Sequence, residues 1–192
     1  RPELRVFTTG DIMTLTGLAP AAAAQALSRL NETGLVSRLK RGVWASSLAA
    51  DLDPYEAAAC LRAPWPAYVS LHSALADYGV LEEVPQAVYV VCAAAPKRYR
   101  NALGEFRIHH LPQRLIWGYE AKRRGKSSYL MAEREKAFLD LAYLSLTPRC
   151  PLLFPVKRGR RWGLDLKKLR QYARKFNYPP LDSWLQENGL SG

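Results

Sequence analysis

The chain has 192 residues, 48% of them hydrophobic, and carries 28 Lys and Arg against 17 Asp and Glu, a net charge of +11. This length fits one domain, or a small domain joined to a larger one. No run of 18 apolar residues is present, so we expect no membrane span and no membrane partner. The basic balance instead favours an acidic partner, most simply nucleic acid.

The charge is unevenly distributed along the chain. Residues 1–50 carry a net +3, residues 51–95 a net −5 and residues 96–192 a net +13. An acidic middle segment therefore separates two basic ones. The three cysteines are odd in number and widely spaced in apolar sequence, which is typical of reduced thiols and favours a cytoplasmic protein.

The first 50 residues predict two helices, a short turn between them and a β-hairpin. The first helix ends at Gly17, and Pro20 suits the first turn of the second, which ends at Gly34. The residues expected to face the core from the second helix are Ala23, Leu27 and Leu30. A hairpin turning at Gly42 follows. This order predicts a winged helix-turn-helix at residues 1–50, with its usual leading helix truncated because only RPELRV precedes.

The second helix would then be the recognition helix. Small uncharged residues let a helix approach the floor of the major groove, where Gln pairs with adenine and alanine methyl groups touch thymine. The predicted base-reading residues are Ala21, Ala22 and Gln25. The residues predicted to contact phosphates are Ser28, Arg29, Arg38, Lys40 and Arg41. The alternative is a generic helical subdomain followed by a solvated hairpin.

Residues 51–192 predict a second, mixed α/β domain, so the expected fold class is α+β. Helices are expected at residues 53–63, 68–79, 133–146, 165–176 and 181–189. Strands are expected at residues 87–93, 105–111, 114–120 and 128–132.

Two basic stretches of this domain, residues 121–127 and 156–163, are expected to be loops. Their cations are Lys122, Arg123, Arg124, Lys126, Lys157, Arg158, Arg160 and Arg161. Glycines would let the backbone approach a phosphate, and Trp162 could stack on an exposed base, so a second nucleic-acid surface is one interpretation. The other is that these are solvated loops that contribute only solubility.

The sequence holds no evident catalytic constellation. His109 and His110 are neighbours on a predicted strand, so their side chains point to opposite faces and cannot easily share a metal. Within residues 133–140, Lys136 and Asp140 are four apart, which favours ion pairs on one helix. We therefore expect no enzyme, no cofactor and no metal. A metal-dependent nuclease remains an alternative, as does an RNA-binding or toxin-binding interaction protein.

Three stretches together resemble the AbiEi family, the antitoxins and transcriptional repressors of type IV toxin–antitoxin systems. They are the N-terminal segment that ends in RLKRGVWA, residues 68–91 (YVSLHSALADYGVLEEVPQAVYVV) and residues 131–144 (MAEREKAFLDLAYL). The resemblance implies a winged domain that binds operator DNA to repress its own operon, and a C-terminal domain needed for antitoxicity. It also implies a nucleotidyltransferase-like toxin encoded nearby, which the antitoxin counters without necessarily binding it.

Overall fold

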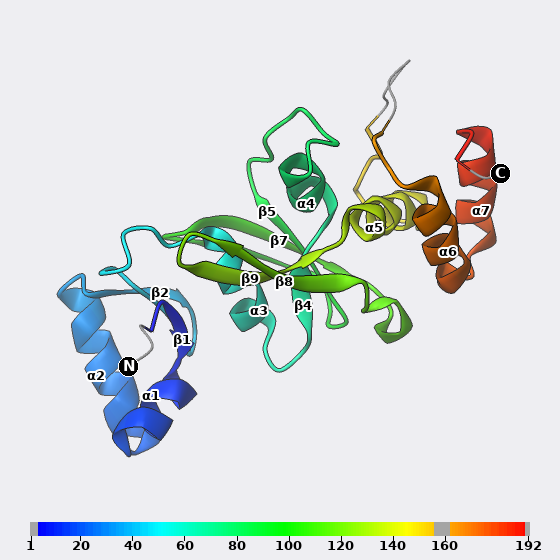
Figure 1. The fold of residues 1–192 in the computed structure, drawn as a ribbon. Helices are drawn as coiled ribbons and strands as arrows, with labels where there is room; N and C mark the ends of the chain where they lie inside the picture. The colour runs from blue at the N-terminus through cyan, green and yellow to red at the C-terminus, as the bar shows by residue number, and fades with distance from the viewer. Residues whose placement is uncertain (1–3, 156–161, 191–192) are drawn as a thin grey trace.

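The computed structural model describes residues 4–155 and 162–190, and these residues form a mixed α and β structure (Figure 1). The helices are α1 (Thr9–Thr16), α2 (Pro20–Glu32), α3 (Ala57–Arg62), α4 (Leu71–Asp77), α5 (Arg134–Leu146), α6 (Leu166–Phe176) and α7 (Pro179–Glu187). The strands are β1 (Val6–Thr8), β2 (Val36–Lys40), β3 (Val43–Ser46), β4 (Ala67–Val69), β5 (Val88–Cys92), β6 (Lys97–Asn101), β7 (Gly104–His110), β8 (Tyr119–Arg124) and β9 (Ser127–Ala132). Among these elements no helix is long and apolar enough to cross a membrane.

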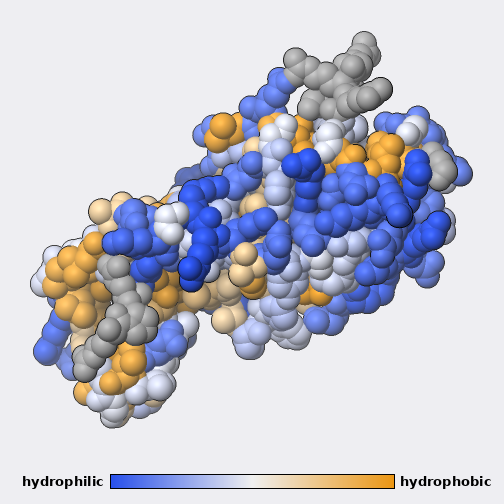
Figure 2. All heavy atoms as spheres, in the orientation of Figure 1, coloured by the Kyte–Doolittle hydropathy of each residue, from blue (hydrophilic) through white to orange (hydrophobic). Residues whose placement is uncertain are grey.

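An N-terminal lobe, residues 4–46, packs α1 and α2 on a three-stranded antiparallel sheet of order β1-β3-β2. Helix α2 buries Ala23 and Leu27 in the lobe. The predicted core position of Leu30 is wrong, because its side chain is 38% exposed. Of the three predicted core residues of α2, only Ala23 and Leu27 face the small sheet. Apolar surface remains visible on this lobe (Figure 2).

The small sheet is buried on both faces. Its helix side holds a cluster of Phe7, Leu27, Val36 and Trp44. Its other side belongs to the main core, in which Val43 and Ala45 share one cluster with Leu61 of α3. The lobe therefore continues into the rest of the molecule, residues 51–155 and 162–190, which we call the body.

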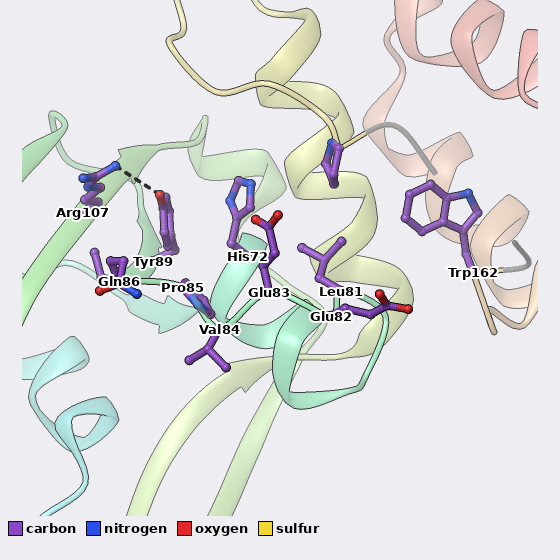
Figure 3. A pocket seen from close by; sticks show the side chains of 12 residues that line it. His72, Leu81, Glu82, Glu83, Val84, Pro85, Gln86, Tyr89, Arg107 and Trp162 are labelled. Atoms are coloured by element: carbon purple, nitrogen blue, oxygen red, sulfur yellow. Dashed lines mark hydrogen bonds between the residues drawn. The ribbon is translucent and has the colours of Figure 1, made fainter. Parts of the chain in front are cut away.

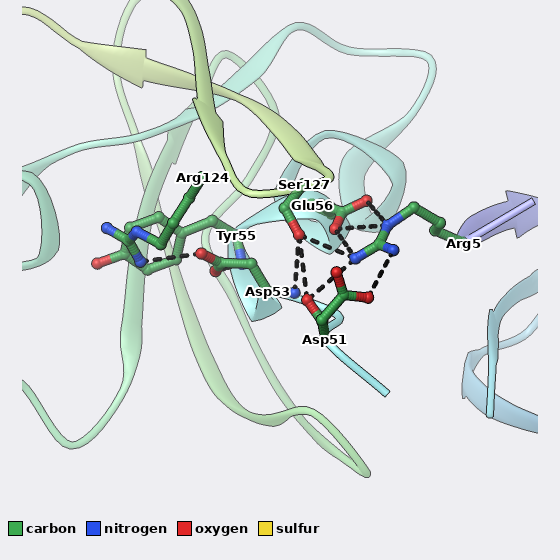
Figure 4. A network of polar contacts seen from close by, with 7 residues as sticks. All are labelled: Arg5, Asp51, Asp53, Tyr55, Glu56, Arg124 and Ser127. Atoms are coloured by element: carbon green, nitrogen blue, oxygen red, sulfur yellow. Dashed lines mark hydrogen bonds and ion pairs between the residues drawn. The ribbon is translucent and has the colours of Figure 1, made fainter. Parts of the chain in front are cut away.

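A buried arginine ties the lobe to the body (Figure 4). Arg5, 9% exposed, donates to the Asp51 carboxylate at 2.9 Å and to the Glu56 carboxylate at 3.1 Å. It also donates to the hydroxyl of Ser127, in β9, at 3.0 Å. Hydrogen bonds to Glu56 and Asp51 raise the pKa of Arg5 above its usual range. We call this group the Arg5 clamp.

The body is built on a six-stranded mixed sheet of order β6-β7-β5-β4-β9-β8. Figure 1 shows α4 and α5 on one face and α3 on the other. The predicted strands at residues 87–93 and 105–111 are confirmed as β5 and β7, and the predicted helices at 133–146 and 165–176 as α5 and α6. The predicted helix at residues 181–189 corresponds to α7.

The predicted helix at residues 68–79 is wrong in its first part. Residues 67–69 form β4, a central strand buried on both faces. Ser70 then adopts an extended conformation, and Leu71, the first residue of α4, a left-handed one with φ of 55°. Three buried residues are too few to show a strand period, and the apolar pattern of α4 extends over them.

Helix α5 lies in the core and carries an ion pair there. Lys136 and Asp140, four residues apart and both fully buried, contact each other directly, as their spacing predicts. Tyr68 bridges them, since it accepts from Lys136 at 2.9 Å and donates to Asp140 at 3.2 Å, and Ser70 donates to Asp140 at 2.9 Å. This network joins α5 to β4 and fixes the turn that precedes α4.

Removing one member of this pair should destabilise the protein strongly. Asp140→Ala leaves the ammonium group of Lys136 buried without its counter-charge, which costs about 3–5 kcal/mol. Urea unfolding followed by circular dichroism measures the loss. The double variant Lys136→Met, Asp140→Leu is the control and should lose much less, because it removes both buried charges. Equal losses in the two variants would contradict a stabilising charge pair.

The neighbouring histidines lie on opposite faces of β7, as predicted. His109 stacks beside Tyr89 of β5 with 5.9 Å between ring centroids, while His110 is exposed and lies 3.3 Å from the carbonyl oxygen of Ala94. Burial, and to a smaller extent the charges of His72 and Arg107, lower the pKa of His109 to about 4. His109 is therefore neutral at pH 7.

This shift predicts a pH-dependent stability. In the unfolded chain His109 takes up a proton near pH 6.5, whereas in the folded chain it does so only near pH 4. The unfolded state thus binds more protons in this window, and the free energy of unfolding should fall as the pH drops from about 6.5 to about 4. His109→Gln should show a shallower fall than the parent in urea titrations at several pH values. Parallel pH profiles of the two proteins would contradict this assignment.

Candidate nucleic-acid interface

Helix α2 presents a smooth outer surface at its N-terminal half. Ala21, Ala22 and Gln25 are all exposed, on the side opposite the buried Ala23 and Leu27. The helix begins at Pro20 after Ala19, and no side chain caps its first turn. The three residues predicted to read bases thus share one open helix surface, on which Gln25 is the one long polar side chain.

A hollow of about 280 Å³ separates α2 from the β2–β3 hairpin. Ala24 and Ser28 line it from the helix, and Arg38 and Arg41 line it from the hairpin. Three of the five predicted phosphate contacts therefore line a single space: Arg38 and Arg41 from the hairpin and Ser28 from the helix. We call this space the helix–hairpin hollow.

Hydrogen bonds hold the walls of the hollow in place. The amide of Thr9, at the start of α1, donates to the carbonyl oxygen of Gly42 at 3.0 Å, and the Trp44 indole donates to the Thr9 hydroxyl at 3.0 Å. The guanidinium group of Arg38 lies 5.7 Å from the Trp44 ring centroid. The amide of Arg38 also donates to the Asn31 side chain at 3.1 Å, which links the hairpin to the end of α2.

Lys40 lies on the other face of the hairpin. A β-bulge separates Arg38 from Lys40, so that Arg38 pairs with Trp44 and Lys40 pairs with Val43. Cross-strand partners share a face, and Val43 packs in the main core rather than against α2. Lys40 therefore does not line the helix–hairpin hollow. Arg29, on the exposed side of α2, does not line it either.

The sequence reasoning missed Thr9, Asn31 and Trp44 as parts of this site. Trp44 is 4% exposed, and its indole both supports Arg38 and anchors Thr9. In the sequence, the signal for Trp44 is its position two residues after the turn glycine Gly42, within a basic stretch. Nothing in the spacing of Thr9 or Asn31 indicates a contact with the hairpin.

The predicted basic loop at residues 121–127 is largely β-strand. β8 extends to Arg124, and the hairpin to β9 turns at residues 125–126. Arg124 is held by ion pairs with Asp53 at 2.9 Å and with Asp77, and Lys122 pairs with Glu120 at 2.6 Å. These internal partners leave much less free charge than the sequence suggests.

Arg123 and Lys126 are exposed, and the cations of the second basic stretch, Lys157, Arg158, Arg160 and Arg161, lie outside the described residues. Trp162 packs edge-on against the aromatic rings of Phe138 and Phe154, with centroids 5.3 and 5.5 Å apart. Its ring is thus engaged in the body, which corrects the expectation that it stands ready to stack on a base. Within residues 4–155 and 162–190, no group of three or more His, Cys, Asp or Glu side chains could hold a metal ion.

Comparison with known families places the lobe. Residues 3–47 match the family model of the AbiEi antitoxin, described as a transcriptional regulator. This part of the chain is similar to AbiEi antitoxins. The match covers α1, α2, the hairpin and the Arg5 position, which agrees with the resemblance seen in the sequence. No curated protein matches the chain.

The two faces of the hairpin predict different effects on DNA binding. Arg38→Ala removes a cation from the helix–hairpin hollow and should make the slope of log affinity against log salt shallower by about 1. Lys40→Ala removes the same charge from the opposite face and should leave the slope unchanged. Fluorescence anisotropy of a labelled duplex at four salt concentrations checks both. Equal changes would contradict the placement of the DNA backbone in the hollow.

Proposed function

We propose that this AbiEi-type protein is a cytoplasmic, sequence-specific repressor that binds operator DNA and serves as the antitoxin of a type IV toxin–antitoxin system. In this proposal α1 and α2 form a helix-turn-helix, and the β2–β3 hairpin is its wing. The observation that carries the proposal is the pairing of a small, uncharged helix surface with a cationic hollow beside it.

Major-groove binding suits this pairing of surfaces. A helix whose outer N-terminal residues are alanines can lie deep in the groove, where Gln25 reaches adenine and the methyl groups of Ala21 and Ala22 reach thymine. The DNA backbone bordering that groove then passes the hollow, where Arg38, Arg41 and Ser28 contact phosphate oxygens. In this proposal the outer surface of α2 reads the bases, and the neighbouring helix–hairpin hollow positions the protein on the DNA backbone.

The body would supply the antitoxin activity. The expected functional partner is a nucleotidyltransferase-like toxin encoded in the same operon, with which direct contact is not required. Support for this part rests on the AbiEi match of the lobe and on the likeness of residues 68–91 and 131–144 to that family. Those stretches form the centre of the body, since they include β4, α4, β5 and most of α5.

The test is a change of sequence preference at Gln25. Gln25→Ala should lose discrimination at one or two base pairs, which costs about 1–3 kcal/mol on the operator and little on random duplex. The operator is first located by footprinting the promoter region of the protein's own operon. Titrations of both duplexes with both proteins then give the specificity ratio.

Gln186→Ala is the matched control, because Gln186 is an exposed glutamine on α7 of the body. It should bind both duplexes as the parent does. A Gln25→Ala variant that weakens operator and random DNA equally would remove base readout from α2. A parent protein that binds no duplex more tightly than another would overturn the repressor proposal itself.

A further inference from the structure

A polar trough crosses the body sheet on the face of α4, away from the lobe's helices. Its floor is a row across three strands, in which Tyr89 of β5 pairs with Arg107 of β7 and Arg107 pairs with Arg98 of β6. Side chains in such a row share one face of the sheet. His109 follows two residues after Arg107 on the same strand and so belongs to that face.

Two adjoining cavities make up the trough, and Arg107 lines both. One, of about 530 Å³, lies between His72 of α4, Tyr89 and the loop of residues 81–87 (Figure 3). The other, of about 420 Å³, lies over Arg98 and His109. Each volume is in the range of small-molecule sites.

The cationic end of the trough holds two guanidinium groups on directly opposed positions. Arg107 is partly compensated, because Glu105 accepts from it at 2.7 Å and the hydroxyl of Tyr89 accepts from it at 3.2 Å. Arg98 is exposed, and no acidic side chain among the described residues pairs with it. Like charges directly opposite each other destabilise a strand pair, and an anion bound between them would relieve this.

At the other end of the trough uncharged rings form the floor, and Glu82 and Glu83 of the 81–87 loop line the wall. The ring centroids of His72 and Tyr89 are 4.7 Å apart, and the ring of Tyr89 in turn stacks on the ring of His109. Burial lowers the pKa of both imidazoles, so they are neutral at pH 7. Buried nitrogens, Nδ1 of His72 and Nε2 of His109, have no hydrogen-bond partner among the described residues. Such groups normally have a hydrogen-bond partner.

We propose that this trough binds a nucleotide, with its phosphate between Arg98 and Arg107 and its base beside His72, Tyr89 and His109. Paired arginines are the preferred binders of phosphate oxygens. Neutral aromatic and imidazole rings suit an uncharged, planar, hydrogen-bonding base. The nucleotide is either free or part of a single strand, because the site recognises the same phosphate and base in both. This site is separate from the helix–hairpin hollow and goes beyond the operator binding proposed above.

The experiment uses the full chain with two probes, adenosine monophosphate and a fluorescein-labelled ten-nucleotide single-stranded RNA. Because a protein of charge +11 attracts any nucleic acid, the matched control has to lose the same charge elsewhere. Arg98→Ala changes the exposed arginine of edge strand β6, and Arg123→Ala changes an exposed arginine of edge strand β8. Arg98→Ala should weaken RNA binding on the order of 10-fold, and Arg123→Ala less than about 2-fold.

The three histidines supply a second readout. In imidazole NMR spectra, ligand binding should shift the signals of His72 and His109, whereas His110 on the opposite face should not move. Shifts with adenosine monophosphate alone support a site for a free nucleotide, and shifts with RNA alone support a site for a strand.

Three results would overturn the proposal. The first is that neither probe shifts His72 or His109. The second is that Arg98→Ala and Arg123→Ala weaken RNA binding equally, which would assign the binding to general charge. The third is that Arg41→Ala in the hairpin abolishes RNA binding, which would assign it to the helix–hairpin hollow. Operator affinity of Arg98→Ala should match the parent, so failure here leaves the repressor proposal intact.

Discussion

One buried guanidinium group joins the N-terminal lobe to the body beside their shared apolar core. Arg5 precedes β1, and its partners come from residues 51, 56 and 127, so one side chain gathers the start of the lobe, the linking segment and the tip of the β8–β9 hairpin. A guanidinium group offers five donors in a planar fork and stays charged, so it can be buried only where acceptors surround it. The Arg5 clamp meets this need where the lobe joins the body.

Two kinds of pattern explain which elements the sequence predicts. Helix α6 and strand β7 have a clear period, whereas helix α5 and strand β5 are recognised as long or continuous apolar runs. Strand β6, with the sequence KRYRN, and most of β8, with YEAKRR, were missed because edge strands carry charge that discourages pairing with other chains. Their basic residues give these strands the sequence pattern expected of a solvated loop.

The candidate site was predictable in its order but not in its details. Helix, turn, helix and hairpin identify the lobe, and the alanine-rich half of α2 is exposed. The separation of Arg38 from Lys40 depends on a bulge that no residue pattern announces. The loss of Arg124 as a free cation depends on Asp53 and Asp77, which are 71 and 47 residues away in the chain. Contacts of this range are set by tertiary packing, which local sequence does not show.

The same contacts change the meaning of the acidic segment at residues 51–95. From the sequence it looked like an acidic surface between two basic ones, yet four of its six acidic residues serve as internal counter-charges. Asp51 and Glu56 hold Arg5, and Asp53 and Asp77 hold Arg124. Positive charge is thus neutralised where the lobe meets the body and along β8. Among the described residues, arginines line the helix–hairpin hollow and the β6 end of the trough, and an anionic ligand gains from binding in either place.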